Sequence, residues 1–298
     1  SGSVGMMGIS WGGFNALQIA AHRPPALKAI VSVCSTDDLY TDNMHYKGGC
    51  LLTDNLVEAT TMLSVNTSPP DPELVGEDWR EMWHERLAGS GLWLESWLTH
   101  QRRDEYWEHG SVSEDYSAIV CPTLVVGGWF DGFRNSIFRL LEHLEVPRWG
   151  IVGPWAHCYP HYGVPGPAIG FLQECDRFWR AHLFEDGEPY EAPRLRAWIM
   201  DSLPPATRHA VRPGRWVAED GWPSTNVRTE RWPIAPARLF RPGKEIRRKR
   251  RPQTIQSPLN VGQVAGKWLS SAVGPDLAHD QREEDGGALT FDSLPLQE

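Results

Sequence analysis

Residues 4–34 are VGMMGISWGGFNALQIAAHRPPALKAIVSVC. Residues 4–8 form a short apolar run, and after a glycine-rich turn the apolar residues recur at helical spacing as far as Ala21. The pair Pro24-Pro25 cannot continue that helix, and residues 29–34 form a continuous apolar run typical of a buried strand. A strand, a helix and a second strand in this order predict parallel pairing with a right-handed connection.

The same alternation returns later in the chain. Residues 123–128 and 148–153 have the pattern of buried strands, and residues 133–144 and 171–184 have the pattern of helices. Between residues 36 and 119 the strand pattern disappears, while large apolar side chains recur at spacing four, as at Trp79, Trp83 and Leu87. We therefore expect an α/β domain over residues 1–187 with a helical insertion at 36–119, called the cap below. The cap tryptophans pack either within an ordinary helical bundle or against a substrate pocket.

The composition and pattern of the sequence change after Gly187. Short β-like runs at 195–200, 215–218, 228–232 and 288–291 are separated by many Pro and Gly residues. This spacing predicts a second, antiparallel β domain over residues 188–298. The basic run KEIRRKRR at 244–251 matches a nucleic-acid-binding pattern, but a solvated loop is the better interpretation in a chain of net charge −9.

Composition excludes several classes of protein. The chain has 298 residues, of which 41% are hydrophobic and 22% charged, and no run of eighteen apolar residues, so we expect a globular protein without a membrane span. The net charge of −9 argues against nucleic acid as the main partner. Five cysteines are scattered without a C-x-x-C pair, which fits reduced thiols in a cytosolic enzyme and gives no sign of a structural zinc site.

The turn after the first strand carries a chemical motif. Gly8-Ile9-Ser10-Trp11-Gly12 matches G-x-S-x-G, in which glycines make room for a strained turn that presents a serine hydroxyl above a sheet. The helix that follows points its positive N-terminus at the turn, where negative charge develops on an acyl oxygen. Ser10 is therefore the candidate nucleophile, with the Trp11 N–H as an oxyanion donor.

A serine nucleophile needs a histidine base and a carboxylate that orients it. Asp131 follows the strand at 123–128 and His157 follows the strand at 148–153, so both belong at the sheet edge that holds Ser10. Asp131 has the alternative of a turn-forming aspartate before Gly132. His157 has the alternative of a metal ligand together with Cys158 and His161, but Pro160 breaks the helix that such a pair needs, so we predict no metal.

Three ordered motifs resemble one known family. GISWGG at 8–13, GWFDGF at 128–133 and GPWAH at 153–157 are similar to motifs of the CocE/NonD hydrolases, the group of cocaine esterase and the Xaa-Pro dipeptidyl-peptidases. DLAHDQR at 276–282 and LTFDS at 289–293 resemble that group's jelly-roll domain. The resemblance implies an α/β-hydrolase sheet with a cap and a C-terminal β-sandwich. It also implies a cofactor-free triad of Ser10, Asp131 and His157.

The chain departs from this family pattern at both ends. Members place several strands before the serine turn, and a tyrosine hydroxyl in that region completes the oxyanion hole, whereas only the Trp11 N–H is present here. The jelly roll stops at Glu298 before its later strands. We therefore expect a partial sheet in an internal fragment of a longer protein, with an open edge that favours self-association into a homo-oligomer.

The substrate is the least determined part of the prediction. We expect a small ester or a short peptide, with Phe133 and the cap tryptophans lining an apolar acyl pocket. The acidic pair Asp37-Asp38 follows a central strand and either holds a substrate ammonium or caps the next helix. The alternative to a serine hydrolase is a non-catalytic protein that uses the same body for binding or assembly.

Overall fold

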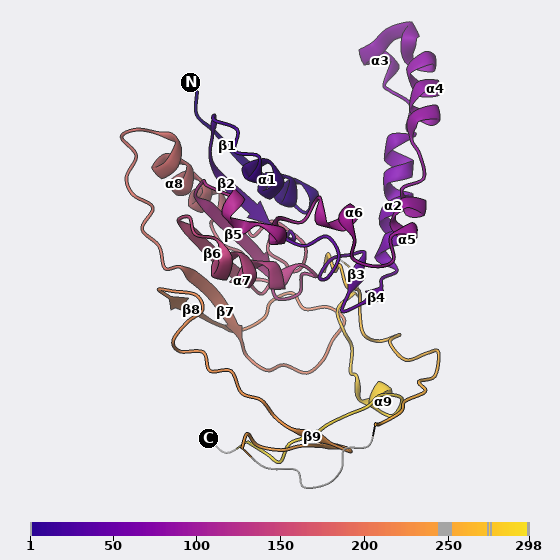
Figure 1. Ribbon diagram of the computed structural model, residues 1–298, viewed down its shortest axis with the longest axis vertical. Coiled ribbons are helices and arrows are strands. Elements are labelled where there is room, and N and C mark those ends of the chain that lie inside the picture. Colours follow the sequence, from indigo (N-terminus) through magenta and orange to yellow (C-terminus); the bar gives the residue numbers. More distant parts are fainter. Residues whose placement is uncertain (1, 244–251, 273, 275, 297–298) are drawn as a thin grey trace.

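A computed structural model describes residues 2–243, 252–272, 274 and 276–296 (Figure 1). Its centre is a six-stranded sheet of order β1-β2-β5-β6-β7-β8. The strands are β1 Val4–Ile9, β2 Leu27–Val33, β5 Thr123–Gly128, β6 Arg148–Gly153, β7 Leu195–Met200 and β8 Gly214–Glu219. Neighbouring strands from β1 to β7 pair in parallel, and β8 pairs with β7 antiparallel. The basic run at 244–251 lies outside the described residues.

Helices cover both faces of this sheet. On one face, α1 (Trp11–Ala21) and α7 (Arg134–His143) pack against a core that includes Ile30 of β2. On the other face, α8 (Phe171–Leu183) packs against Ala29 and Val31 of the same strand. Because successive side chains of a strand point to opposite faces, β2 is apolar without alternation, as the sequence predicts. No helix in the described ranges is both long enough and apolar enough to cross a bilayer.

The parallel register brings the functional candidates to one edge. Ile9 is paired with Val33, Val33 with Val126, and Gly128 with Gly153. The loops that follow β1, β5 and β6 therefore leave the sheet on the same side. The expected placement of Ser10, Asp131 and His157 at a common edge follows directly from this register.

The cap is helical, as expected, apart from a small hairpin. Its elements are β3 Tyr46–Lys47, β4 Cys50–Leu51, α2 Asp54–Asn66, α3 Pro72–Val75, α4 Trp79–Gly89, α5 Trp93–Thr99 and α6 Glu105–Glu108. In Figure 1, α2, α3 and α4 project away from the sheet, and the rings of Trp79 and Trp83 stack on each other in α4. Trp97 and Trp107 instead are buried and border a cavity. The cap tryptophans therefore fall into two groups, one that projects with α4 and one that borders the cavity.

The region after residue 187 differs from the sequence prediction. β7 and β8, assigned there to a separate β domain, continue the central sheet because β7 pairs with residues 150–152 of β6. Further along, the described residues form only β9 Ile234–Ala235, β10 Arg238–Leu239 and the short helix α9 Arg282–Asp285. The runs at 228–232 and 288–291 are not strands, and an isolated bridge joins Arg238 to Asp292, the residue after the second run. The C-terminal jelly roll is not confirmed.

The turn between β1 and α1 depends on one of its glycines much more than on the other. A Cβ on Gly8 would lie 2.3 Å from the carbonyl carbon of Gly12, whereas a Cβ on Gly12 would meet nothing within 4 Å. We expect Gly8→Ala to lower the free energy of unfolding by about 1–3 kcal/mol, since backbone must move to relieve the overlap. Gly12→Ala should change it by less than about 1 kcal/mol, because alanine only improves the helix propensity of α1.

Urea unfolding followed by tryptophan fluorescence measures both changes. The two variants add the same methyl group to the same motif, so each is the control for the other. Equal losses in the two variants would contradict the described packing of β1 against the first turn of α1.

Candidate active site

Ser10 occupies a strained turn. It joins β1 to α1 with φ 57° and ψ −121°, a conformation that non-glycine residues rarely adopt and that is typical of serine nucleophiles on such turns. Its N–H donates to the carbonyl oxygen of Val33 at 2.9 Å, which ties the turn to β2. The Ser10 side chain does not cap α1, and Ser10 lines the cavity described below. Within the described part of the chain, the Ser10 hydroxyl therefore remains available to a ligand in the cavity.

Trp11 is the first residue of α1. The N–H groups of Gly13 and Phe14 already donate to the carbonyl oxygen of Ser10, whereas the Trp11 N–H precedes the hydrogen-bond ladder of the helix. It lies beside Ser10 at the positive end of the helix dipole. This is the position that the sequence analysis expects for an oxyanion donor.

The structure brings Asp131 and His157 together. His157 Nδ1 lies 3.0 Å from Asp131 Oδ1, and the Asp131 side chain is fully buried while 15% of the His157 side chain is exposed. The backbone N–H of His157 donates to the carbonyl oxygen of Ser270, and this hydrogen bond holds the loop after β6 in place. Among the residues that the structure describes, Ser10 and His157 share no hydrogen bond; in unliganded enzymes this bond is often long and shortens when substrate binds.

Cys34 is a neighbour of this pair that the sequence analysis did not single out. Its thiol, the Asp131 carboxylate and the His157 ring offer ligand atoms that all lie within 4.8 Å of one another. Burial, reinforced by the negative charge of Asp131, raises the pKa of the Cys34 thiol well above its ordinary value. Metal binding requires the thiolate, so the environment favours a protonated thiol beside the carboxylate. The available signal was position, since Cys34 follows β2 directly at the same sheet edge.

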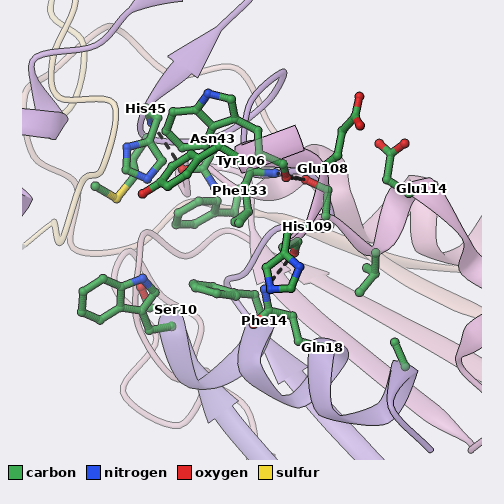
Figure 2. Close-up of a pocket in the computed structure, with 18 of the residues that line it drawn as sticks. Ser10, Phe14, Gln18, Asn43, His45, Tyr106, Glu108, His109, Glu114 and Phe133 are labelled. Carbon is green, nitrogen blue, oxygen red and sulfur yellow. Dashed lines mark hydrogen bonds between the residues drawn. The ribbon is translucent and has the colours of Figure 1, made fainter. Parts of the chain in front are cut away.

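A cavity of about 1100 Å³ opens in front of Ser10 (Figure 2). Figure 2 shows side chains of the turn and α1, including Ser10, Phe14 and Gln18, along one side and His45 with Tyr106 along the other. Phe133 lines the cavity, as the sequence predicts, and its ring centroid lies 5.7 Å from that of His157. The cap contributes Trp93, Trp97 and Trp107 to the lining.

Asp37 and Asp38 do not line this cavity. Asp37 is fully buried against Arg139, whose Nε lies 3.0 Å from Asp37 Oδ2, and the Tyr116 hydroxyl donates to the same carboxylate. Asp38 Oδ1 accepts hydrogen bonds from the N–H groups of Tyr40 and Thr41 at 2.8 and 2.9 Å. The expected contact with a substrate ammonium is therefore wrong for both residues, because both carboxylates already have partners within the protein.

Glu58 is a cavity carboxylate that the sequence did not reveal. It lies on α2 and lines the cavity together with Glu108 and Glu114. Burial raises the pKa of Glu58, and the nearby His157 opposes this shift. Arg103 forms ion pairs with both Glu108 and Glu114. Glu58 thus brings negative charge to the His157 side of the cavity, and nothing in the local sequence around residue 58 marks it.

Comparisons with known proteins show which proteins this chain resembles. The chain is 25% identical over 179 residues to cocaine esterase of Rhodococcus sp. (strain MB1 Bresler), an alignment that covers 52% of this chain and 31% of the esterase. A CocE/NonD family hydrolase from Staphylococcus aureus superimposes with a TM-score of 0.59 at 17% identity over 80% of this chain and 38% of its own. An aminopeptidase from a marine sediment archaeon (Thaumarchaeota) superimposes with a TM-score of 0.52 at 18% identity. This superposition covers 80% of this chain and 42% of the aminopeptidase. The chain thus spans about a third of the length of its curated relative.

Family membership follows from the part of the chain that carries Ser10, Asp131 and His157. The sequence profile of the X-Pro dipeptidyl-peptidase (S15) family matches residues 1–159, which is just over half of the chain. The resemblance of the three sequence motifs to CocE/NonD hydrolases is confirmed by these relatives. This chain belongs to the X-Pro dipeptidyl-peptidase (S15) family.

Proposed function

We propose that the protein is a serine hydrolase that cleaves ester or amide bonds through an acyl-enzyme on Ser10. The observation that carries this proposal is the positive φ of Ser10 at the junction of β1 and α1, beside a large cavity. A strained serine is maintained at a cost of about 1–3 kcal/mol, and such strain concentrates at functional sites. The Asp131–His157 pair at the same sheet edge supplies the other two groups that the reaction requires.

The reaction proceeds in two halves. His157 Nε2 takes the proton of the Ser10 hydroxyl while Oγ attacks the substrate carbonyl carbon, and the Trp11 N–H binds the oxygen that becomes negative. The imidazolium of His157, stabilised by Asp131, then gives its proton to the leaving alcohol or amine. Water attacks the acyl-enzyme in the second half with His157 again as base, and Ser10 is released with its proton.

The lining of the cavity restricts the acyl group. Apolar surface is offered by Phe133, Trp93 and Trp97. Binding of an apolar or aromatic acyl group to this surface lowers the free energy, because it removes apolar area from water. The charge of Glu58 disfavours an anionic substrate near His157. Similarity to a cocaine esterase and to the X-Pro dipeptidyl-peptidase family supports an ester or a short peptide as substrate.

Covalent labelling tests the proposal without knowledge of the natural substrate. The folded chain is incubated with a fluorophosphonate, and the adduct is located by mass spectrometry of its peptides. We expect one adduct on Ser10, because only an activated serine hydroxyl displaces fluoride from phosphorus at an appreciable rate. Ser10→Ala should abolish labelling, and Ser64→Ala, which removes an exposed hydroxyl on α2, should leave it unchanged.

The opposite outcome is equally informative. Cooperative unfolding in urea establishes that the protein is folded under the labelling conditions. A folded chain that acquires no adduct at Ser10 would refute the proposal. It would support the alternative of a non-catalytic protein that uses the cavity for binding or assembly.

A further inference from the structure

His45 is a buried polar residue of the cavity that the proposed reaction does not use. It directly precedes β3, is 9% exposed and lines the cavity. Its ring packs against the indoles of Trp97 and Trp107, with centroids 4.5 and 4.8 Å away. In Figure 2 it lies across the cavity from Ser10. A polar ring held between two indoles is fixed in orientation, so the direction of its nitrogen atoms is set before any ligand arrives.

Asn55 determines which nitrogen of His45 carries the proton. The amide nitrogen Nδ2 of Asn55 donates to the carbonyl oxygens of His45 at 2.8 Å and of Leu52 at 2.9 Å. Both of its hydrogens are thus used by groups that can only accept, which fixes the orientation of the amide. Asn55 Oδ1 then faces His45 Nδ1 at 2.6 Å and must accept from it. Nδ1 therefore carries the hydrogen, and Nε2 presents a lone pair.

The charge state of the ring reinforces this assignment. Burial lowers the pKa of His45 to about 4, and the hydrogen bond to Asn55 opposes this shift only in part. The imidazole is therefore neutral at neutral pH, and Nε2 acts only as an acceptor. Within the described residues, the His45 ring makes a side-chain hydrogen bond only at Nδ1, and His45 lines the cavity, so Nε2 is available to a ligand there.

We propose that His45 Nε2 is a specificity-determining acceptor that binds a hydroxyl or N–H group of the substrate. This inference rests on the proposed function, because it takes the ligand to be the substrate. It adds a substrate class, namely esters or amides that carry a hydrogen-bond donor away from the scissile bond. A ligand without a donor that fills this part of the cavity excludes water from Nε2 and offers no hydrogen bond in its place. Such a ligand bears the cost of an unsatisfied buried acceptor.

Matched ligand pairs test this assignment without turnover. Ser10→Ala protein is titrated with methyl esters of ω-hydroxy acids of four to eight carbons, each paired with the ester in which the hydroxyl is replaced by a methyl group. Binding is followed by the tryptophan fluorescence of the protein, since Trp97 and Trp107 contact His45. The measured quantity is the ratio of the two dissociation constants in each pair.

Two substitutions of His45 isolate the hydrogen bond. His45→Phe keeps an aromatic ring between the two indoles and removes the acceptor, whereas His45→Gln keeps an acceptor at about the same reach. In the pair whose length reaches His45, we expect the preference for the hydroxy ester to fall about two- to tenfold in His45→Phe. His45→Gln should retain part of the preference for the hydroxy ester. A difference between the two variants in this direction is not explained by loss of packing, because glutamine packs less well than phenylalanine between the indoles.

The outcomes separate this inference from the proposed function. If no pair shows a preference that His45→Phe removes, or if His45→Phe and His45→Gln lose the same amount, His45 is not the acceptor. That result leaves labelling of Ser10 by the fluorophosphonate untouched. If labelling fails while the preference for the hydroxy ester depends on His45, the cavity binds donors but the chain is not a serine hydrolase.

Discussion

Asp131→Asn should slow the proposed reaction of Ser10 about 10⁴-fold, the loss that the same substitution of the orienting aspartate produces in a serine protease. Asp131 Oδ1 lies 3.0 Å from His157 Nδ1, and the carboxylate is fully buried. In the proposed reaction, its charge stabilises the imidazolium that forms when His157 takes the proton of Ser10. In a buried site this attraction is weakly screened by solvent, so its loss is large.

Neither orientation of the asparagine amide restores the function. With its oxygen toward His157, the amide keeps the hydrogen bond to Nδ1–H but has no charge to stabilise an imidazolium. With its nitrogen toward His157, it donates to Nδ1, which forces the proton onto Nε2 and removes the base that faces Ser10. Asp131 Oδ2 has no hydrogen-bond partner among the described residues, so no hydrogen bond at that atom selects the first orientation.

Two readouts measure the effect. They are the hydrolysis of 4-nitrophenyl butyrate and the second-order rate constant for labelling of Ser10 by a fluorophosphonate. Asp176→Asn is the control, because it makes the same substitution in an exposed ion pair with Arg180 on α8. A loss of less than tenfold in Asp131→Asn, or a similar loss in Asp176→Asn, would contradict the assignment of Asp131 as the residue that orients His157.

Much of the fold was predictable because its pattern is local. The strands β2 and β5 are mostly apolar and show no alternation, since both faces of the sheet are covered. The serine turn carries the glycines of its motif within five residues. β7 and β8 could not be placed in this way. β7 is a strand in either architecture, and its partner β6 lies more than forty residues earlier. Strand pairing over that distance leaves no periodicity in the sequence.

The residues of the site were likewise predictable where the signal is local and not predictable where it depends on distant contacts. Ser10, Asp131 and His157 each follow a strand that the sequence shows, so their common edge follows from parallel pairing alone. Asp37 also follows a strand, but its partner Arg139 is 102 residues away on α7. Position at the sheet edge therefore could not distinguish a carboxylate that faces substrate from one buried in an ion pair. His45 belongs to the cap, where contacts with Asn55 of α2, Trp97 of α5 and Trp107 of α6 create its environment.

Arg139→Met should lower the free energy of unfolding by about 3–5 kcal/mol at neutral pH, the usual cost of removing one partner of a buried ion pair. Arg139 Nε lies 3.0 Å from Asp37 Oδ2, and its Nη1 lies 2.8 Å from Asp42 Oδ2. The Asp37 side chain is fully buried and that of Asp42 is 9% exposed. Methionine matches the length of the arginine stem but leaves the fully buried Asp37 carboxylate without its cation.

The dependence on pH follows from Asp42. Burial raises its pKa, but the hydrogen bonds and charges of Lys47 and Arg139 prevail, and the pKa lies below the ordinary value for an aspartate. Stability from a carboxylate with a lowered pKa is present above the pKa of the unfolded chain and is lost as the pH falls through the folded one. The difference in unfolding free energy between wild type and Arg139→Met should therefore narrow in acid.

Urea unfolding of the variant at neutral and acidic pH measures both effects. Arg180→Met is the matched control, because Arg180 Nε also lies 2.8 Å from an aspartate oxygen, that of Asp176, while both side chains are more than half exposed. Exposed pairs contribute about 0–1 kcal/mol, so that variant should unfold nearly as the wild type does. Equal losses in the two variants would show that Asp37 is not a buried, paired carboxylate, and a contact between Asp37 and substrate would again have to be considered.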